Sequence, residues 1–341
     1  FIANIIKKDD TISIAERRKL EQFPQISAKT VFNGTFFNKF NKYTTDQFVL
    51  REEFRKLKIN AEYNLLRKSD YNNLYQYGDY IISQTYPLNE KSVLNISKKI
   101  NQIYEQYLTD QNNVYFTIVP DKNYFINDEN LKLDYNKLEN LLNRKLSFAK
   151  YIRIFDMLEL EDYYKTDTHW KQERLLKVAK TIAESMNVNL ENEYKEKTIC
   201  DFQGTYSGQL PISTAKDKIK ILTNSEIEKS KVYNYETKKE NKVYNMEKIN
   251  SLDKYDIYLS GATPVLKIEN PENKTGNELI IFRDSYASSL VPLFIPKYSK
   301  ITLIDTRYIS PKLLPNYVEF NNQDILFMYS TLVINNSYSL K

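Results

Sequence analysis

The stretch ELIIFRDSYASSLVPLFIPKY, residues 278–298, joins a short apolar run to a segment with helical spacing. A nearly continuous apolar run bounded by polar residues is typical of a strand buried on both faces. Ser285 lies in the turn between the strand predicted at 278–282 and the helix predicted at 285–298. At the start of a helix, backbone N–H groups without helical partners can stabilise an anion. The stretch therefore predicts a strand–turn–helix unit with a serine at its turn.

The same alternation continues on both sides of this unit. Further strands are predicted at 114–120, 151–157, 300–305 and 324–330, and further helices at 91–108, 133–146, 171–186 and 310–320. Strands that alternate with helices at this pitch form βαβ units, and these build a parallel sheet with helices on both faces. The predicted fold class is therefore α/β, with the active site beyond the carboxyl ends of the strands.

Two regions depart from the alternation. Residues 1–70 read as an irregular lead-in with one helix, within 44–66, and a short strand is predicted at 80–83. Residues 190–255 are polar and weakly periodic, with some β character. Because there is no internal repeat and no Pro/Gly/Ser-rich linker, we expect the lead-in to pack on one larger domain at 71–341. That domain carries an insertion at about 190–260.

Composition excludes several classes of function. The 341 residues, 41% of them hydrophobic, suffice for a large core, and the chain has one cysteine, Cys200, and one histidine. It therefore has no internal disulfide framework, and a structural transition-metal site is a poor fit. The net charge of +5 comes from interspersed charges, so no nucleic-acid partner is expected. Only six glycines occur, without a dinucleotide or P-loop motif, and we expect neither a cofactor nor a metal.

The single histidine, His169, lies in KTDTHWKQE (165–173), after the strand predicted at 151–157. A serine hydroxyl is a weak nucleophile and needs a base within hydrogen-bond reach. That base needs an acceptor that holds it in one tautomer, and Asp167 precedes His169 by two residues. Because both loops follow strand ends of one sheet, the sequence predicts that Asp167, His169 and Ser285 converge as a triad.

Each of these residues also has a structural interpretation. A lone histidine is often a packing residue, and Ser285 or Asp284 could serve as an ordinary helix N-cap. Trp170 could fix the loop by packing or offer a face to a sugar. The occurrence of all the chemical groups at two strand ends favours the triad.

Several segments resemble a known family. They are SIAERRKLEQFP (13–24), TDQFVLREEF (45–54), VYFTIVPDKNY (114–124), YYKTDTHW (163–170), DKYDIYLSGATPVLKIEN (253–270), LIIFRDSYASSLVPLF (279–294) and YSKITLIDTRYI (298–309). Together they resemble the DHHW proteins and the related alginate O-acetylation proteins, which are SGNH-hydrolase-like enzymes of polysaccharide acetylation. The D-T-H-W and R-D-S-Y pair, in that order and separation, is the most specific part.

The resemblance implies a three-layer α/β/α fold with a mostly parallel sheet and a permuted order of catalytic motifs. It implies Ser285 as nucleophile, His169 as general base and Asp167 as the orienting acid. It also implies a polysaccharide acceptor, and an acetyl donor supplied by a membrane-bound O-acyltransferase partner. We further expect a place at the extracellular face of the membrane or in the medium, with a signal or anchor preceding Phe1. FIANII (1–6) is then the end of such an anchor or a short strand.

One departure from the family concerns the oxyanion site. Relatives have a Gly-Gly-Asn-like turn where this chain reads Ser260-Gly261-Ala262-Thr263. We expect Gly261 and Thr263 to substitute as donors, since loss of one donor costs about 10²–10³ in rate. Arg283 and Arg307 are expected near the same sheet edge, either in contact with substrate or in ion pairs.

Three functions remain open at this point. The first is an O-acetyltransferase that acts on an extracellular or cell-surface polysaccharide through an acetyl-serine intermediate. The second is a carbohydrate acetylesterase with the same triad, because only the exclusion of water separates the two reactions. The third is a non-catalytic glycan-binding subunit of an export or acetylation complex. A metal-dependent mechanism ranks last, since one histidine and scattered carboxylates are not a ligand set.

Overall fold

The computed structural model describes residues 4, 6–126, 130–212 and 215–341. The strand or anchor end expected at residues 1–6 falls largely outside them. The chain divides into two compact units, each described here by itself. The N-terminal unit comprises Phe1–Ile82, Lys165–Asp167 and Gln203–Lys216, and the sheet unit comprises Ser83–Tyr164, Thr168–Phe202 and Asp217–Lys341. This division differs from the predicted boundary at residue 70, and the packing of the lead-in on the larger domain stays a prediction.

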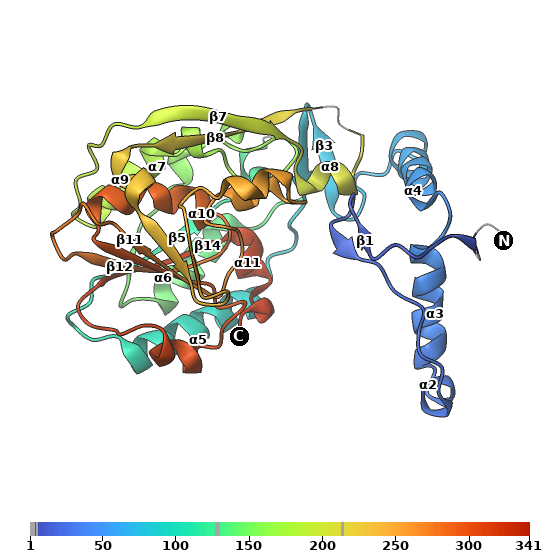
Figure 1. Ribbon diagram of the computed structural model, residues 1–341, viewed down its shortest axis with the longest axis horizontal. Helices are drawn as coiled ribbons and strands as arrows, with labels where there is room; N and C mark the ends of the chain where they lie inside the picture. Colours follow the sequence, from blue (N-terminus) through green and yellow to red (C-terminus); the bar gives the residue numbers. More distant parts are fainter. Residues whose placement is uncertain (1–3, 5, 127–129, 213–214) are drawn as a thin grey trace. The chain divides into compact units, whose positions relative to one another are not determined.

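An eight-stranded sheet forms the centre of the sheet unit (Figure 1). Its strands lie in the order β10 (Lys239–Asn241), β9 (Lys231–Asn234), β11 (Val265–Glu269), β13 (Lys300–Ile304), β12 (Glu278–Arg283), β14 (Asp324–Ser330), β5 (Val114–Val119) and β6 (Lys150–Tyr151). The strands from β13 to β6 are parallel, whereas β11, β9 and β10 pair antiparallel at the other edge. The predicted α/β class with a mostly parallel sheet is confirmed.

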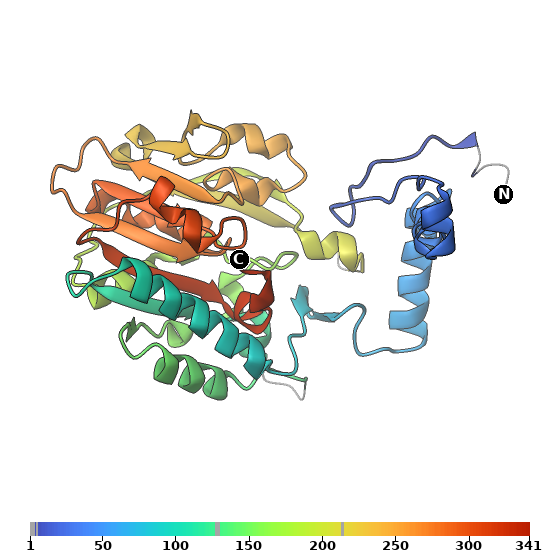
Figure 2. The same ribbon diagram turned by 90° about the horizontal axis from the view of Figure 1, so that it is seen from below.

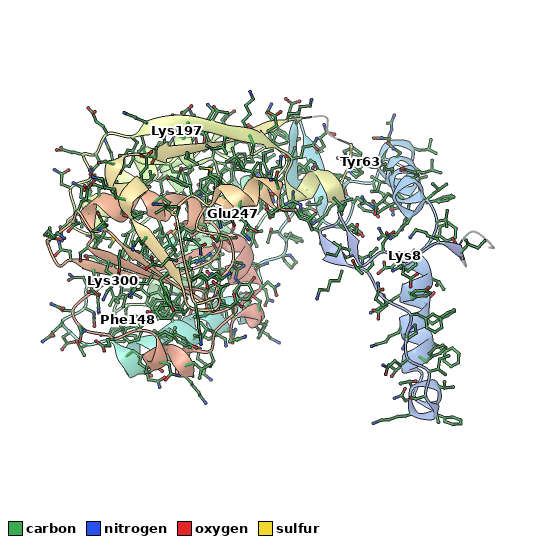
Figure 3. The ribbon with its side chains drawn as sticks, viewed as in Figure 1. Lys8, Tyr63, Phe148, Lys197, Glu247 and Lys300 are labelled. Atoms are coloured by element: carbon green, nitrogen blue, oxygen red, sulfur yellow. The ribbon has the colours of Figure 1, made fainter. Side chains whose placement is uncertain are left out.

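Helices cover both faces of this sheet, which gives the three layers (Figures 1 and 2). Successive side chains of β12 alternate between the faces: Leu279 and Ile281 join one apolar cluster, and Ile280 and Phe282 join the other. The first cluster includes the apolar side of α7 (Leu176–Ser185), and the second includes those of α5 (Glu90–Tyr107) and α6 (Tyr135–Lys145). Figure 3 shows side chains filling the space between these layers, whereas Lys197 is exposed.

The predicted insertion is partly a piece of the sheet. β7 (Lys195–Phe202) and β8 (Asp217–Thr223) form a separate two-stranded antiparallel sheet, and α9 (Ser225–Lys229) follows. β9 and β10 then extend the central sheet at its edge. Short edge strands tolerate polar residues, and this explains why the sequence pattern does not mark them.

Prolines shorten two predicted helices. In place of the helix at 285–298, α10 spans Ala287–Leu290 and a 3-10 helix spans Val291–Lys297. Pro292 and Pro296 lack the N–H group that an α-helix requires. The helix predicted at 310–320 is likewise a 3-10 turn. Because α10 has only four residues, its dipole is small, and stabilisation of an anion at Ser285 depends on individual N–H groups.

Short elements complete the sheet unit. They are α11 (Thr331–Asn335) and 3-10 turns at Lys122–Phe125, Phe155–Met157, Leu160–Asp162, Gln172–Arg174, Met246–Asn250, Lys254–Ile257, Pro311–Asn316 and Ser337–Ser339. The strand predicted at 151–157 is much shorter in the structure, because Phe155 turns out of the sheet to pack edge-on against Tyr124 and Tyr135.

The N-terminal unit is built from short elements. They are β1 (Ile12–Ser13), β2 (Arg18–Lys19), α2 (Ala28–Phe32), α3 (Thr35–Asp46), α4 (Arg51–Asn60), a π-helical turn (Ala61–Leu65), β3 (Leu74–Tyr77), β4 (Tyr80–Ser83) and α8 (Thr205–Gln209). The single helix predicted within 44–66 is broken before α4, where Leu50 adopts a left-handed φ of 58°. The apolar cluster of this unit is small, and its buried members are Ile59, Leu74, Ile81 and Leu210.

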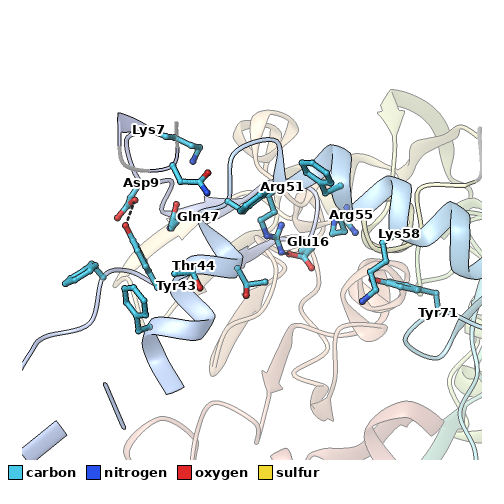
Figure 4. A pocket seen from close by; sticks show the side chains of 16 residues that line it. Lys7, Asp9, Glu16, Tyr43, Thr44, Gln47, Arg51, Arg55, Lys58 and Tyr71 are labelled. Atoms are coloured by element: carbon cyan, nitrogen blue, oxygen red, sulfur yellow. Dashed lines mark hydrogen bonds and ion pairs between the residues drawn. The ribbon is translucent and has the colours of Figure 1, made fainter. Parts of the chain in front are cut away.

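A cavity of about 1160 Å³ lies within the N-terminal unit (Figure 4). Aromatic rings such as Phe23 and Phe54 line it together with charged side chains such as Arg51 and Lys58. The hydroxyl of Tyr43 donates to Asp9 at 3.1 Å in its wall. None of the helices in the described part of the chain is both long and apolar enough to cross a membrane.

Candidate active site

Ser285 lies in a tightly fixed turn at the carboxyl end of β12. The carboxylate of Asp284 accepts hydrogen bonds from the backbone N–H groups of Tyr286 (3.0 Å) and Ser330 (2.7 Å). The second bond ties the turn to the end of the neighbouring strand β14. Every residue from Leu279 to Pro296 is buried except Ser285, which is partly exposed. The fold therefore presents one hydroxyl at this strand end and encloses its neighbours.

His169 lies next to this hydroxyl. Its Nε2 atom is 2.8 Å from Oγ of Ser285, within hydrogen-bond reach. The loop that carries His169 is closed by an antiparallel bridge between Tyr163 and Trp170, and the N–H of Tyr164 donates to the carbonyl of His169 at 3.0 Å. The structure thus brings together the predicted base and the predicted nucleophile, from loops more than a hundred residues apart in the chain.

Trp170 supports the site through hydrogen bonds from its buried indole. It is fully buried, and its indole N–H donates to the carbonyl of Tyr286 (3.0 Å) and to the hydroxyl of Ser289 (3.1 Å). Both partners lie just after Ser285, so the indole connects the histidine loop to the serine turn. A fully buried ring has no face to offer a sugar, and the interpretation of Trp170 as a substrate platform is replaced by a packing role.

Asp167 is fully buried and belongs to the N-terminal unit. Its carboxylate accepts hydrogen bonds from the backbone N–H of Thr205 (2.8 Å) and from the Thr205 hydroxyl (3.1 Å). Gly204 packs so closely that a Cβ atom there would lie 2.3 Å from Cβ of Asp167. The carboxylate is therefore held in place, and its role toward His169, two residues along the chain, stays a prediction.

The turn expected to supply oxyanion donors differs from the prediction at Gly261. The N–H of Gly261 already donates to the carbonyl of Tyr258 at 3.2 Å, within a turn where Leu259, Ser260 and Gly261 all have positive φ. Gly261 therefore serves the conformation of this turn, and its N–H is engaged within the turn instead of being available to an oxyanion. The hydroxyl of Thr263, by contrast, is buried and has no hydrogen-bond partner. An unpaired buried hydroxyl costs free energy, so Thr263 is the stronger candidate for a ligand contact.

The two arginines expected at this sheet edge, in contact with substrate or in ion pairs, both make contacts within the fold. Arg283 is fully buried; its guanidinium contacts the Ser288 hydroxyl at 3.2 Å, and burial lowers its pKa. Arg307 makes a two-pronged ion pair with Asp305, at 2.9 and 2.7 Å, and this pair raises its pKa against the opposing effect of burial. Arg307 is therefore in the ion pair that was one of its two predicted roles. Arg283 supports the serine turn through its contact with Ser288.

A second buried carboxyl group lies at the same edge of the sheet. Asp121 follows β5 and accepts hydrogen bonds from the hydroxyls of Thr331 (2.6 Å) and Tyr135 (3.1 Å). Burial raises the pKa of Asp121, opposed by these hydrogen bonds. Its oxygens accept hydrogen bonds within the fold, so Asp121 connects the end of β5 to Thr331 at the end of β14. Among the described residues, no group of three or more His, Cys, Asp or Glu side chains could hold a metal ion.

Sequence reasoning missed one residue of the site. The ring of Tyr255 stacks on the imidazole of His169, with centroids 3.8 Å apart and planes 9° from parallel. Tyr255 is one of 28 tyrosines and lies outside the D-T-H-W and R-D-S-Y motifs. It falls within the segment 253–270, but nothing in that segment marks it as a neighbour of His169. Only the fold places it beside the histidine.

Comparison with known proteins agrees with this fold. No protein-family model and no curated protein sequence matches the chain. Among solved structures, a DHHW family protein from Eubacterium siraeum matches with a TM-score of 0.61 and 21% identity, over 78% of this chain and 95% of that one. Bacillus cereus PatB1, solved with a sulfonyl adduct, matches with a TM-score of 0.62 and 16% identity, over 76% and 95%.

The O-acetyltransferase domain of Pseudomonas putida AlgJ matches with a TM-score of 0.50 and 10% identity, over 77% of this chain and 92% of that one. At these identities the likeness concerns the fold, and it agrees with the resemblance carried by the D-T-H-W and R-D-S-Y segments. The chain therefore has the SGNH-like fold shared by a DHHW family protein and an O-acetyltransferase domain.

Proposed function

We propose that this protein is a serine-dependent O-acetyltransferase that acts on a polysaccharide. The observation that carries the proposal is the 2.8 Å approach of His169 Nε2 to Oγ of Ser285, the one partly exposed residue of its turn. The fold shared with the AlgJ O-acetyltransferase domain supports acyl transfer as the reaction class.

In the first step, Oγ of Ser285 attacks the carbonyl carbon of the donor's acetyl group while His169 accepts the hydroxyl proton. The proton then passes to the departing donor group, which leaves an acetyl-serine. In the second step, a sugar hydroxyl attacks this ester, gives its proton to His169 and leaves as the acetylated sugar, and the proton returns to Ser285. General base catalysis of this kind is worth about 10²–10⁴ in rate.

The other groups have supporting roles in this mechanism. The N–H of Ser285 and the unpaired hydroxyl of Thr263 would hold the oxyanion. Asp167, two residues before His169 and buried, would fix the tautomer of the imidazole. The stacked ring of Tyr255 would limit rotation of the imidazole.

The proposal also covers where the protein works. We place it at the outer face of the cell, where a membrane-bound O-acyltransferase supplies the acetyl group and a polysaccharide accepts it. Digestion of the protein by protease added to intact cells tests this placement. Complete protection, while a known surface protein is cleaved, would contradict it.

The central test is intact-protein mass after brief exposure to an activated acetyl ester. We expect a single acetyl, which digestion locates on the peptide that contains Ser285. It should be absent in Ser285→Ala and form at least about 10³-fold more slowly in His169→Ala. The matched control is Ser310→Ala, which removes another partly exposed serine whose side chain makes no capping bond. This variant should acetylate like the wild type.

Decay of the acetyl-enzyme with and without oligosaccharide then separates the two enzymatic alternatives. Decay that is faster with oligosaccharide, with acetylated sugar as product, supports the transferase. Decay at one rate, with acetate as product, identifies an esterase. If neither the wild type nor any variant forms an adduct or hydrolyses an ester, the result favours the third alternative, a non-catalytic glycan-binding subunit.

A further inference from the structure

The imidazole of His169 is held between aromatic rings. Tyr255 covers one side in a parallel stack, with centroids 3.8 Å apart, and Tyr286 approaches at 5.1 Å with planes inclined by 56°. His169 itself is only 8% exposed. With the ring enclosed in this way, rotation about its last side-chain bond requires Tyr255 to move.

Tyr255 cannot move easily, because both ends of it are fixed. Its backbone N–H donates to the side chain of Asp253 at 3.1 Å, which caps the turn Lys254–Ile257. Its hydroxyl lies 2.8 Å from the hydroxyl of Ser289. Ser289 is fully buried and also accepts the indole N–H of Trp170.

Ser289 connects this arrangement to the nucleophile. It lies four residues after Ser285, in the short helix α10 that follows the serine turn. The hydrogen bond between the hydroxyls of Tyr255 and Ser289 therefore fixes the position of the stacked ring relative to the serine turn. A shift of the turn would carry the ring with it and keep the imidazole aligned.

We propose that Tyr255, anchored by Ser289, is a positioning residue that aims Nε2 of His169 at Ser285. This inference rests on the proposed function, because positioning matters only if His169 acts as the base. The ring face also favours the positively charged imidazolium that forms when His169 accepts the proton, as in other contacts between a cation and an aromatic ring.

The test uses two variants that differ in the ring alone. Tyr255→Phe keeps the aromatic face and loses the hydroxyl, whereas Tyr255→Leu loses the face. We expect Tyr255→Leu to slow acetyl-enzyme formation by about 10- to 100-fold. Tyr255→Phe should slow it only several-fold, because it keeps the ring face and loses the single hydrogen bond to Ser289. Equal rates for Tyr255→Leu and wild type would overturn the inference.

The chain's only histidine allows a second readout that does not depend on catalysis. Ring protons that lie over an aromatic face shift upfield, so selectively labelled histidine should give one shifted set of NMR signals in wild type and in Tyr255→Phe. These signals should move toward random-coil positions in Tyr255→Leu. Unchanged signals in Tyr255→Leu would overturn the inference.

Two further outcomes stay decisive. If Tyr255→Leu does not fold, Ser289→Ala removes the anchor and keeps the ring. It should broaden the histidine signals and slow acetylation by several-fold, about the loss of one or two hydrogen bonds. Wild-type behaviour in Ser289→Ala would contradict the anchoring. If wild type forms no acetyl-enzyme, the proposed function fails, and the NMR comparison still decides whether Tyr255 stacks on His169.

Discussion

The two units of this chain are stabilised in different ways. The sheet unit contains two large apolar clusters, one on each face of the sheet, whereas the N-terminal unit buries only four apolar side chains in its own cluster. More than half of the exposed large apolar side chains of the described residues lie between Ile6 and Leu66. His169 and Ser285 lie in the unit with the large cores, where positions are fixed by dense packing.

Ion pairs supply part of what the N-terminal unit lacks in apolar packing. Arg18 binds both carboxylate oxygens of Asp46, at 2.8 and 2.6 Å, and Arg51 contacts Glu16 at 2.5 Å. Partly exposed pairs of this kind each contribute about 1 kcal/mol or less. We therefore expect the two units to differ in their response to core substitution, to backbone substitution and to pH.

The largest effect should come from a buried aromatic ring. Phe282 in β12 is fully buried and stacks on Phe327 with centroids 4.7 Å apart. Phe282→Ala should lower the free energy of unfolding by about 3–5 kcal/mol. The matched control is Phe54→Ala in the N-terminal unit, where the ring is 53% exposed and the loss should be about 0.5 kcal/mol or less. Calorimetry measures both, and similar losses would remove the contrast between the units.

A smaller effect should separate two glycines within the sheet unit. Gly261 and Gly276 both have positive φ, 85° and 77°, so alanine costs about 1–2 kcal/mol at either. A Cβ at Gly261 would also lie 2.2 Å from Oδ1 of Asp256, whereas a Cβ at Gly276 meets nothing within 4 Å. Gly261→Ala should therefore be less stable than Gly276→Ala by about 1 kcal/mol or more. Equal urea midpoints would show that packing around this turn is loose.

The smallest effect concerns pH and the N-terminal unit. Hydrogen bonds from Arg18 hold the pKa of Asp46 below its usual value of 3.8, against the opposing effect of burial. A carboxyl group with a lowered folded-state pKa stabilises the fold above the unfolded value and loses this contribution as pH falls through the folded value. Asp46→Asn should therefore destabilise the unit at pH 7, by about 1 kcal/mol, and the difference from wild type should shrink in acid.

Hydrogen exchange of the peptides around Asp46 measures this difference separately for the N-terminal unit. Peptides from β12 serve as the internal control, because they belong to the apolar core of the other unit. A difference between Asp46→Asn and wild type that stays constant from neutral to acid pH would show that the ion pair does not stabilise the unit.

The sequence predicts the parallel sheet well because its strands are continuous apolar runs. β5, β12, β13 and β14 all lie where such runs predict them. The sequence does not predict where helices give way to 3-10 turns, since Pro292 and Pro296 act within an otherwise helical apolar pattern. Nor does it predict β9 and β10, whose short, polar strands depend on pairing with a neighbour.

At the candidate site, the sequence locates the residues that lie in motifs at strand ends. His169 and Ser285 were found because a parallel sheet brings such ends together. The sequence does not show that the N–H of Gly261, predicted as an oxyanion donor, donates to the Tyr258 carbonyl, because this hydrogen bond depends on the conformation of the local turn. Tyr255 could not be found, since its place beside His169 depends on tertiary packing alone.

The burial of the whole run Leu279–Pro296 around Ser285 also bears on how this site could change its substrate. A substitution at any neighbour of Ser285 in that run disturbs the core before it meets a ligand. New specificity, whether selected in the laboratory or in nature, would have to arise in other loops, such as the turn that carries Thr263. The serine turn is thus the fixed part of the site, and redesign of its substrate preference should begin in loops outside Leu279–Pro296.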